Sequence, residues 1–106
     1  MIRIRVEDRD GSIRVIEIPD TVDLNLMETL KIYEYKLRAT CGGMALCADC
    51  HCQVIDGGNN LPEPQDAELI TLENHPGASF NSRLACQIRV AEEIDGLSIR
   101  LMGETE

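Results

Sequence analysis

Five cysteines in 106 residues constrain this chain more than any other feature, because three of them lie in one ten-residue segment. Cys41, Cys47 and Cys50 follow the spacing C-x5-C-x2-C, and 35 residues lie between the third of them and Cys86. An odd number of cysteines cannot pair completely into disulfides. The sequence shows neither a long apolar run nor a signal peptide, so we expect a reducing compartment in which structural disulfides do not form.

The segment 39–50 has no hydrophobic periodicity and contains the adjacent glycines Gly42 and Gly43, which is typical of a loop. Three thiolates in one loop and a fourth from a distant segment favour an iron–sulfur cluster, because thiolate is the soft ligand that such clusters require. The two glycines let the backbone approach the cluster closely. The pattern therefore predicts a cluster site that combines this loop with Cys86.

Other roles for the cysteines stay open at this point. A structural zinc site usually has two C-x2-C pairs, whereas only Cys47 and Cys50 form one here. A thioredoxin-like dithiol accounts for the same pair and leaves Cys41 and Cys86 without a role. Inert core cysteines do not account for the spacing.

Length and charge limit the classes of protein that the chain can represent. We expect residues 1–106 to form one domain, since 106 residues with 43% hydrophobic content suit a single modest core. The net charge of −9 disfavours binding to nucleic acid or to an anionic membrane surface. It favours a basic protein partner and a soluble monomer. The acidic excess is concentrated after residue 53, where ten acidic residues face three basic ones.

Hydrophobic periodicity predicts an α+β fold. Alternation predicts a hairpin of strands over 2–7 and 12–18. Asn25 and Glu28 resemble a capping box, which predicts a helix from Leu26 to Glu34. Further along the chain, the pattern predicts a strand over 51–56, a surface loop over 57–64, a short helix over 66–74, and strands over 83–90 and 96–101.

The run CGGMALCADCH at 41–51, together with SRLACQI at 82–88, closely resembles the adrenodoxin-type 2Fe-2S ferredoxins. The resemblance extends over nearly the whole chain. It implies a β-grasp fold, in which a mixed sheet packs against one main helix and the cluster loop lies at one edge. It also implies that one 2Fe-2S cluster is bound, with Cys41 and Cys47 on the outer iron and Cys50 and Cys86 on the inner one.

The function implied by this resemblance is one-electron transfer by a carrier that is not an enzyme. Such a carrier accepts electrons from a flavoprotein ferredoxin reductase. It delivers them to an acceptor such as a haem-thiolate monooxygenase or another oxygenase, or alternatively to iron–sulfur cluster assembly. We expect it in the bacterial cytoplasm, or in an organelle matrix if a presequence has been removed. Two hypotheses assign the chain to a class other than electron carriers. One is a structural zinc module that binds partners, and the other is a redox sensor.

Several residues outside the ligand set have expected roles. The resemblance implies that His51 supports the cluster loop without binding iron. It also implies that His51 links this loop to the acidic helix, which is the one predicted over 66–74. Cys52 is expected to be a small buried apolar residue, and Arg83 to form a structural salt bridge or to bind backbone. The acidic helix of the family is its docking surface for partners, which here assigns that role to Asp66, Glu68 and Glu73.

Overall fold

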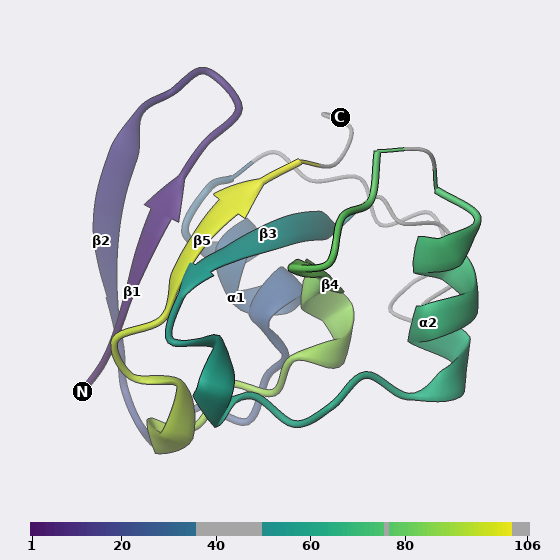
Figure 1. Ribbon diagram of the computed structural model, residues 1–106. Helices are drawn as coiled ribbons and strands as arrows, with labels where there is room; N and C mark the ends of the chain where they lie inside the picture. The colour runs from purple at the N-terminus through teal and green to yellow at the C-terminus, as the bar shows by residue number, and fades with distance from the viewer. Residues whose placement is uncertain (36–49, 76, 103–106) are drawn as a thin grey trace.

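The computed structural model describes residues 1–35, 50–75 and 77–102. Five strands form one mixed sheet in the order β2-β1-β5-β3-β4, and Figure 1 shows the sheet with helix α1 behind it and α2 beside β4. The strands are β1 (Ile2–Glu7), β2 (Ile13–Ile18), β3 (His51–Asp56), β4 (Ser82–Leu84) and β5 (Ser98–Leu101). The helices are α1 (Leu26–Ile32) and α2 (Asp66–Glu73), with short 3-10 turns at Gly58–Asn60, Ala85–Gln87 and Glu92–Ile94.

The hairpin of β1 and β2 forms as the alternation predicts. Ile2, Ile4 and Val6 are fully buried, while the intervening Arg3 and Arg5 point to solvent. This alternation follows from the two-residue period of a strand. Every second side chain of β1 therefore enters the core, and the others cover the outer face of the sheet.

Helix α1 begins at the predicted capping box. The backbone N–H of Glu28 donates to Asn25 Oδ1 at 2.8 Å, and the N–H of Asn25 donates to Glu28 Oε1 at 3.1 Å. These two bonds satisfy donors that the first turn of a helix leaves free. The helix ends at Ile32, two residues earlier than predicted. Its buried face, formed by Leu26, Met27, Thr29 and Leu30, packs on the core.

Strand β5 lies between β1 and β3, parallel to β1 and antiparallel to β3. Its buried residues Ile99 and Leu101 join the two halves of the sheet into one core. The arrangement is that of a mixed sheet packed on a helix, which confirms the predicted α+β β-grasp fold.

The strand predicted over 83–90 is wrong for most of its length. Strand β4 ends at Leu84, and the chain then turns through the 3-10 turn Ala85–Gln87. The apolar residues of this segment are buried on both sides of the turn, so their pattern resembled that of a buried strand. The turn gives Cys86 its position.

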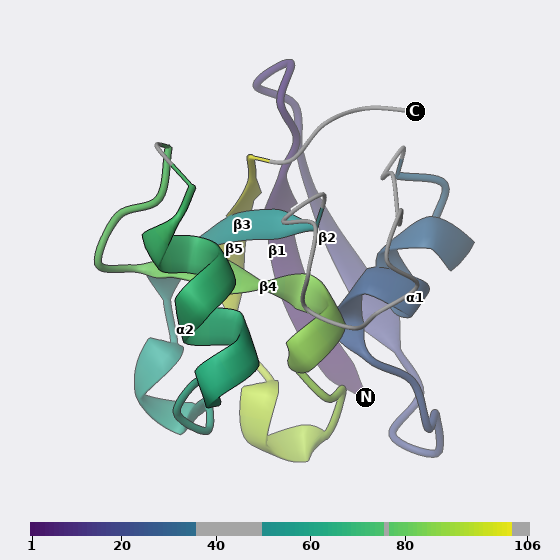
Figure 2. The same cartoon turned by 90° about the vertical axis from the view of Figure 1, so that its right-hand side faces the viewer.

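Figure 2 shows α2 and the Ala85–Gln87 turn on the same side of the molecule. Helix α2 is joined to β4 through the backbone N–H of Leu84, which donates to Glu68 Oε2 at 2.8 Å. Within the described ranges, none of the helices combines the length and the apolar character that crossing a membrane requires.

Candidate metal centre

Cys50 and Cys86 lie side by side although 35 residues separate them in the sequence. The register of β3 and β4 pairs His51 with Leu84, and the N–H of Ala85 donates to the carbonyl oxygen of Cys50 at 3.1 Å. The following 3-10 turn brings the backbone N–H of Cys86 to 3.3 Å from Cys50 Sγ. The two cysteine residues are 4% and 6% exposed.

The chemistry of this pair fits a metal site. The neighbouring Cys86 thiol and burial both raise the pKa of the Cys50 thiol far above its usual range. Two buried thiolates side by side repel each other, so both can be ionised only with a cation between or beside them. The N–H of Cys86 is a donor suited to a charged sulfur. The pair is therefore suited to hold iron or another soft cation.

The other predicted ligands, Cys41 and Cys47, and the glycines Gly42 and Gly43 lie outside the described residues. Among the residues that are described, no group of three or more histidine, cysteine or acidic side chains gathers around a point. Half of the predicted donor set is thus placed by the structure, and that half comes from the segments at the ends of β3 and β4.

His51 follows Cys50 and is almost completely buried. Its Nε2 lies 2.7 Å from Ser82 Oγ, and its ring makes an edge contact with His75, whose ring centroid is 4.9 Å away. Burial and the neighbouring His75 lower the pKa of His51, so the ring is neutral at pH 7. Because His75 follows the end of α2, these contacts connect the residue next to Cys50 with the acidic helix.

Cys52 is fully buried in the core, as predicted. Strand alternation points its side chain away from that of His51. Burial raises the pKa of the Cys52 thiol to about 12, so the group stays protonated. It behaves as a small apolar core residue.

The assignment of Glu68 to a docking surface is contradicted by its burial. Only 1% of this residue is exposed. Its carboxylate accepts from Arg83 Nε at 2.8 Å, from Arg83 Nη2 at 3.3 Å and from the N–H of Leu84 at 2.8 Å. Arg83 also donates from Nη1 to the carbonyl oxygen of Pro62 at 2.9 Å, which confirms its predicted structural role. A carboxylate held in this way cannot meet a partner.

Asp66 and Glu73, in contrast, are exposed at the two ends of α2. Between them, Leu69 and Ile70 are also exposed, at 41% and 59%. A hollow of about 420 Å³ separates this side of α2 from the turn before β4, where Phe80 is completely exposed. The surface of α2 is thus acidic at its ends and apolar in the middle.

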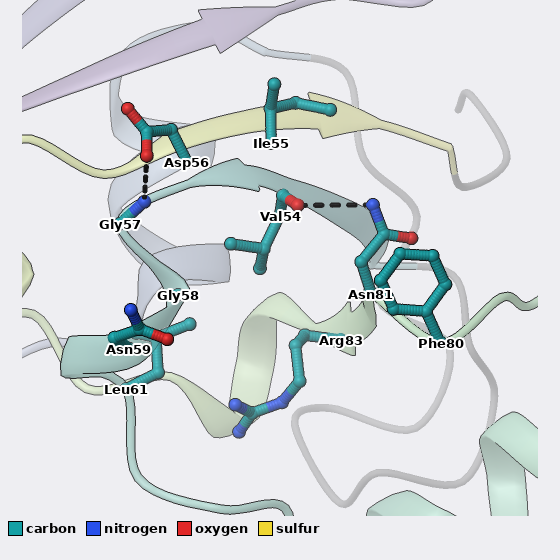
Figure 3. Close-up of a pocket in the computed structure, with 10 residues that line it drawn as sticks. All are labelled: Val54, Ile55, Asp56, Gly57, Gly58, Asn59, Leu61, Phe80, Asn81 and Arg83. Carbon is teal, nitrogen blue, oxygen red and sulfur yellow. Dashed lines mark hydrogen bonds between the residues drawn. The ribbon is translucent and has the colours of Figure 1, made fainter.

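A second hollow of about 420 Å³ lies at the far end of β3 from Cys50 (Figure 3). It is lined by residues 54–59 with Leu61, Phe80, Asn81 and Arg83. Three residues of β3 stand between Cys50 and Val54, the first of the lining residues, so the two lie roughly 13 Å apart at 3.3 Å per residue. The guanidinium of Arg83 at its edge is already neutralised by Glu68. This hollow is therefore separate from the candidate metal centre.

Sequence reasoning missed Gln87 and Ser82 as parts of the site. The side-chain Nε2 of Gln87 donates to Cys86 Sγ at 3.4 Å, and Ser82 bonds His51. Both residues stand beside predicted site residues in the segment 82–88, so proximity in the sequence was the available signal.

Comparison with known proteins places this chain in one class. The family model for the 2Fe-2S iron-sulfur cluster binding domain matches residues 8–91. A 2Fe-2S ferredoxin of Rickettsia felis is 32% identical over 105 residues, which are 98% of this chain and 92% of the relative. Adrenodoxin-like protein 2, mitochondrial, of Arabidopsis thaliana is 32% identical over 106 residues; this chain spans 53% of its length.

Solved structures share the whole fold. The ISC-like 2Fe-2S ferredoxin of Pseudomonas putida superposes with a TM-score of 0.83 at 25% identity, covering 100% of this chain and 96% of that one. Putidaredoxin in its covalent complex with putidaredoxin reductase gives a TM-score of 0.79 at 29% identity, covering 96% and 99%.

The fold and the matched domain define a 2Fe-2S ferredoxin. The chain belongs to the adrenodoxin-type members of this family and binds one 2Fe-2S cluster. It is an electron-transfer protein rather than an enzyme.

Proposed function

We propose that this ferredoxin takes electrons from a flavoprotein reductase and passes them singly to an oxygenase, such as a haem-thiolate monooxygenase. Its cluster is held by Cys41, Cys47, Cys50 and Cys86. When bound, the cluster supplies one-electron redox chemistry. The observation that carries the proposal is the Cys50–Cys86 pair, which is buried and brought together by the sheet register. The similarity to putidaredoxin, solved in complex with its reductase, supports the reductase as electron donor.

Iron–sulfur cluster assembly is the second candidate for the acceptor. The observation that favours it is the similarity to a ferredoxin described as ISC-like, with a TM-score of 0.83. Turnover assays with each class of acceptor separate the two. Only with the physiological acceptor is the rate of electron transfer expected to saturate at a low ferredoxin concentration.

We propose the bacterial cytoplasm or an organelle matrix as the compartment, since one relative is mitochondrial by name and the other is bacterial.

The spectrum of the purified protein tests the electron-carrier function. Protein prepared without oxygen is expected to be red-brown, to contain two irons per chain, to bleach partly with dithionite and to show an EPR signal once reduced. A colourless preparation with one zinc per chain would establish the zinc-module hypothesis instead.

We propose that the exposed surface of α2 is where the reductase docks. Asp66 and Glu73 supply its acidic ends, and no lysine or arginine occurs between Val54 and Ser82. The nearest basic side chain that follows, Arg83, is neutralised by Glu68. The surface therefore suits a reductase with a basic rim, and charges of this kind mainly set the association rate.

Charge reversal at Glu73 (Glu73→Lys) is expected to slow reduction by the flavoprotein reductase about tenfold at low ionic strength. The deficit is expected to shrink in high salt, where exposed charges are screened. Stopped-flow reduction at several salt concentrations measures both effects. Glu93→Lys is the matched control, because Glu93 is exposed in the turn before β5, away from α2. Equal rates for the two variants would place the docking surface elsewhere.

A further inference from the structure

The side chain of Gln87 is directed at a sulfur that the proposed function places on the cluster. Its Nε2 donates to Cys86 Sγ at 3.4 Å, within the range for a hydrogen bond to sulfur. Cys86 is 6% exposed and Gln87 is half-buried, so the bond lies largely out of water. A bond in such surroundings is stronger than one at the surface, because the local dielectric constant is lower.

The backbone directly after Gln87 is anchored, which keeps the base of its side chain beside Cys86. Gln87 ends the 3-10 turn, and the N–H of Ile88 closes this turn on the carbonyl oxygen of Ala85 at 3.2 Å. The carbonyl oxygen of Ile88 in turn accepts from the N–H of Leu26 at 2.7 Å, at the start of α1. Ile88 is fully buried. The turn is thus tied to the helix and the core directly after Gln87.

We propose that the side-chain amide of Gln87 raises the reduction potential of the protein through its bond to Cys86 Sγ. The inference rests on the proposed function, because it requires Cys86 to be a ligand. On reduction, one electron arrives from the reductase and no proton moves to or from Gln87. Part of the added negative charge falls on the ligand sulfurs, and a donor bond to sulfur strengthens as that charge grows. The amide therefore stabilises the reduced state more than the oxidised one.

Gln87→Met tests the proposal, because methionine keeps the length of the side chain and removes the donor. At a fixed solution potential, we expect the ratio of reduced to oxidised protein to fall about three- to tenfold. A dye-coupled spectroscopic titration measures this ratio, and a tenfold change equals a shift of about 59 mV for one electron. Gln53→Met is the matched control, since the Gln53 amide bonds Ser79 and Arg100 instead of a cysteine. Its potential is expected to stay unchanged.

A vibrational measurement separates this bond from a general effect on the site. Resonance Raman frequencies of the Fe–S(Cys) stretches shift when N–H donors to sulfur are exchanged in D2O. The shift is expected to be smaller in Gln87→Met than in the wild type or in Gln53→Met. An unchanged potential in Gln87→Met, or an equal fall in both variants, overturns the inference.

Gln87→Asn covers the case in which the methionine variant does not assemble a cluster. Asparagine keeps an amide but is one methylene shorter, so its donor does not reach Cys86 Sγ, and the same fall in the ratio is expected. If neither variant assembles a cluster while the wild type does, Gln87 is needed for the turn itself and the inference is overturned. If the wild type also lacks a 2Fe-2S cluster, the proposed function fails first.

Discussion

Replacing Cys86 by serine is expected to remove the cluster or to leave a small fraction with an altered visible spectrum. The hydroxyl is a harder ligand than the thiolate, and in the proposed site the Cys50 thiol would lose the neighbouring thiol with which it holds the metal. Iron and sulfide content per chain, with the absorbance spectrum of anaerobically purified protein, measure the loss.

Cys52→Ser is the matched control, because the same substitution is made two residues from Cys50 at a cysteine that is fully buried in the core. It is expected to keep the full iron content and the wild-type spectrum. The hydroxyl lies in an apolar environment there, so stability is expected to fall by about 1–3 kcal/mol. A Cys86→Ser protein with wild-type iron, beside a Cys52→Ser protein without iron, would reverse the proposed ligand assignment.

The second large effect is expected from Arg83→Met, which leaves the Glu68 carboxylate buried with one hydrogen bond from the N–H of Leu84. Breaking a buried ion pair by removing one partner costs about 3–5 kcal/mol. Urea unfolding followed by circular dichroism measures the fall in the midpoint. Because Glu68 joins α2 to β4, we expect the region near Cys86 to loosen first.

Two further variants make this result specific. Arg89→Met removes the partner of Asp23 from a pair whose side chains are 73% and 77% exposed, and its cost is expected to be below about 1 kcal/mol. The double variant Arg83→Met with Glu68→Leu removes both buried charges and is expected to recover part of the lost stability. Equal destabilisation by Arg83→Met and Arg89→Met would show that the Glu68–Arg83 pair is no more important than a surface pair.

The elements with a local chemical signal were predictable from the sequence. The capping box of Asn25 and Glu28 located the start of α1, and the alternation of Ile2, Ile4 and Val6 located β1. The cysteine spacing selected Cys50 and Cys86, which the fold brings together. In each case neighbouring residues along the chain carry the information.

The errors arose where tertiary contacts decide the outcome. Helix α2 has no clear apolar face: Glu68 is buried, whereas Leu69 and Ile70 are exposed. The sequence therefore could not distinguish Glu68 from Glu73, because the difference is the guanidinium of Arg83, fifteen positions away from Glu68. The bond from Gln87 to Cys86 depends on the turn after β4, which the apolar pattern had represented as a continued strand.

The central place of β5 has a consequence for the order in which the molecule matures. Of the described strands, β5 is the last to leave the ribosome, yet it separates β1 from β3. Before it is available, the chain offers two isolated strand pairs, and a single two-stranded hairpin is marginally stable in water. Cys50 directly precedes β3 and Cys86 lies in the turn after β4, so both flank the second of these pairs. The proposed metal site is therefore expected to become durable only once β5 has joined β1 to β3, so stable metal binding requires all five described strands.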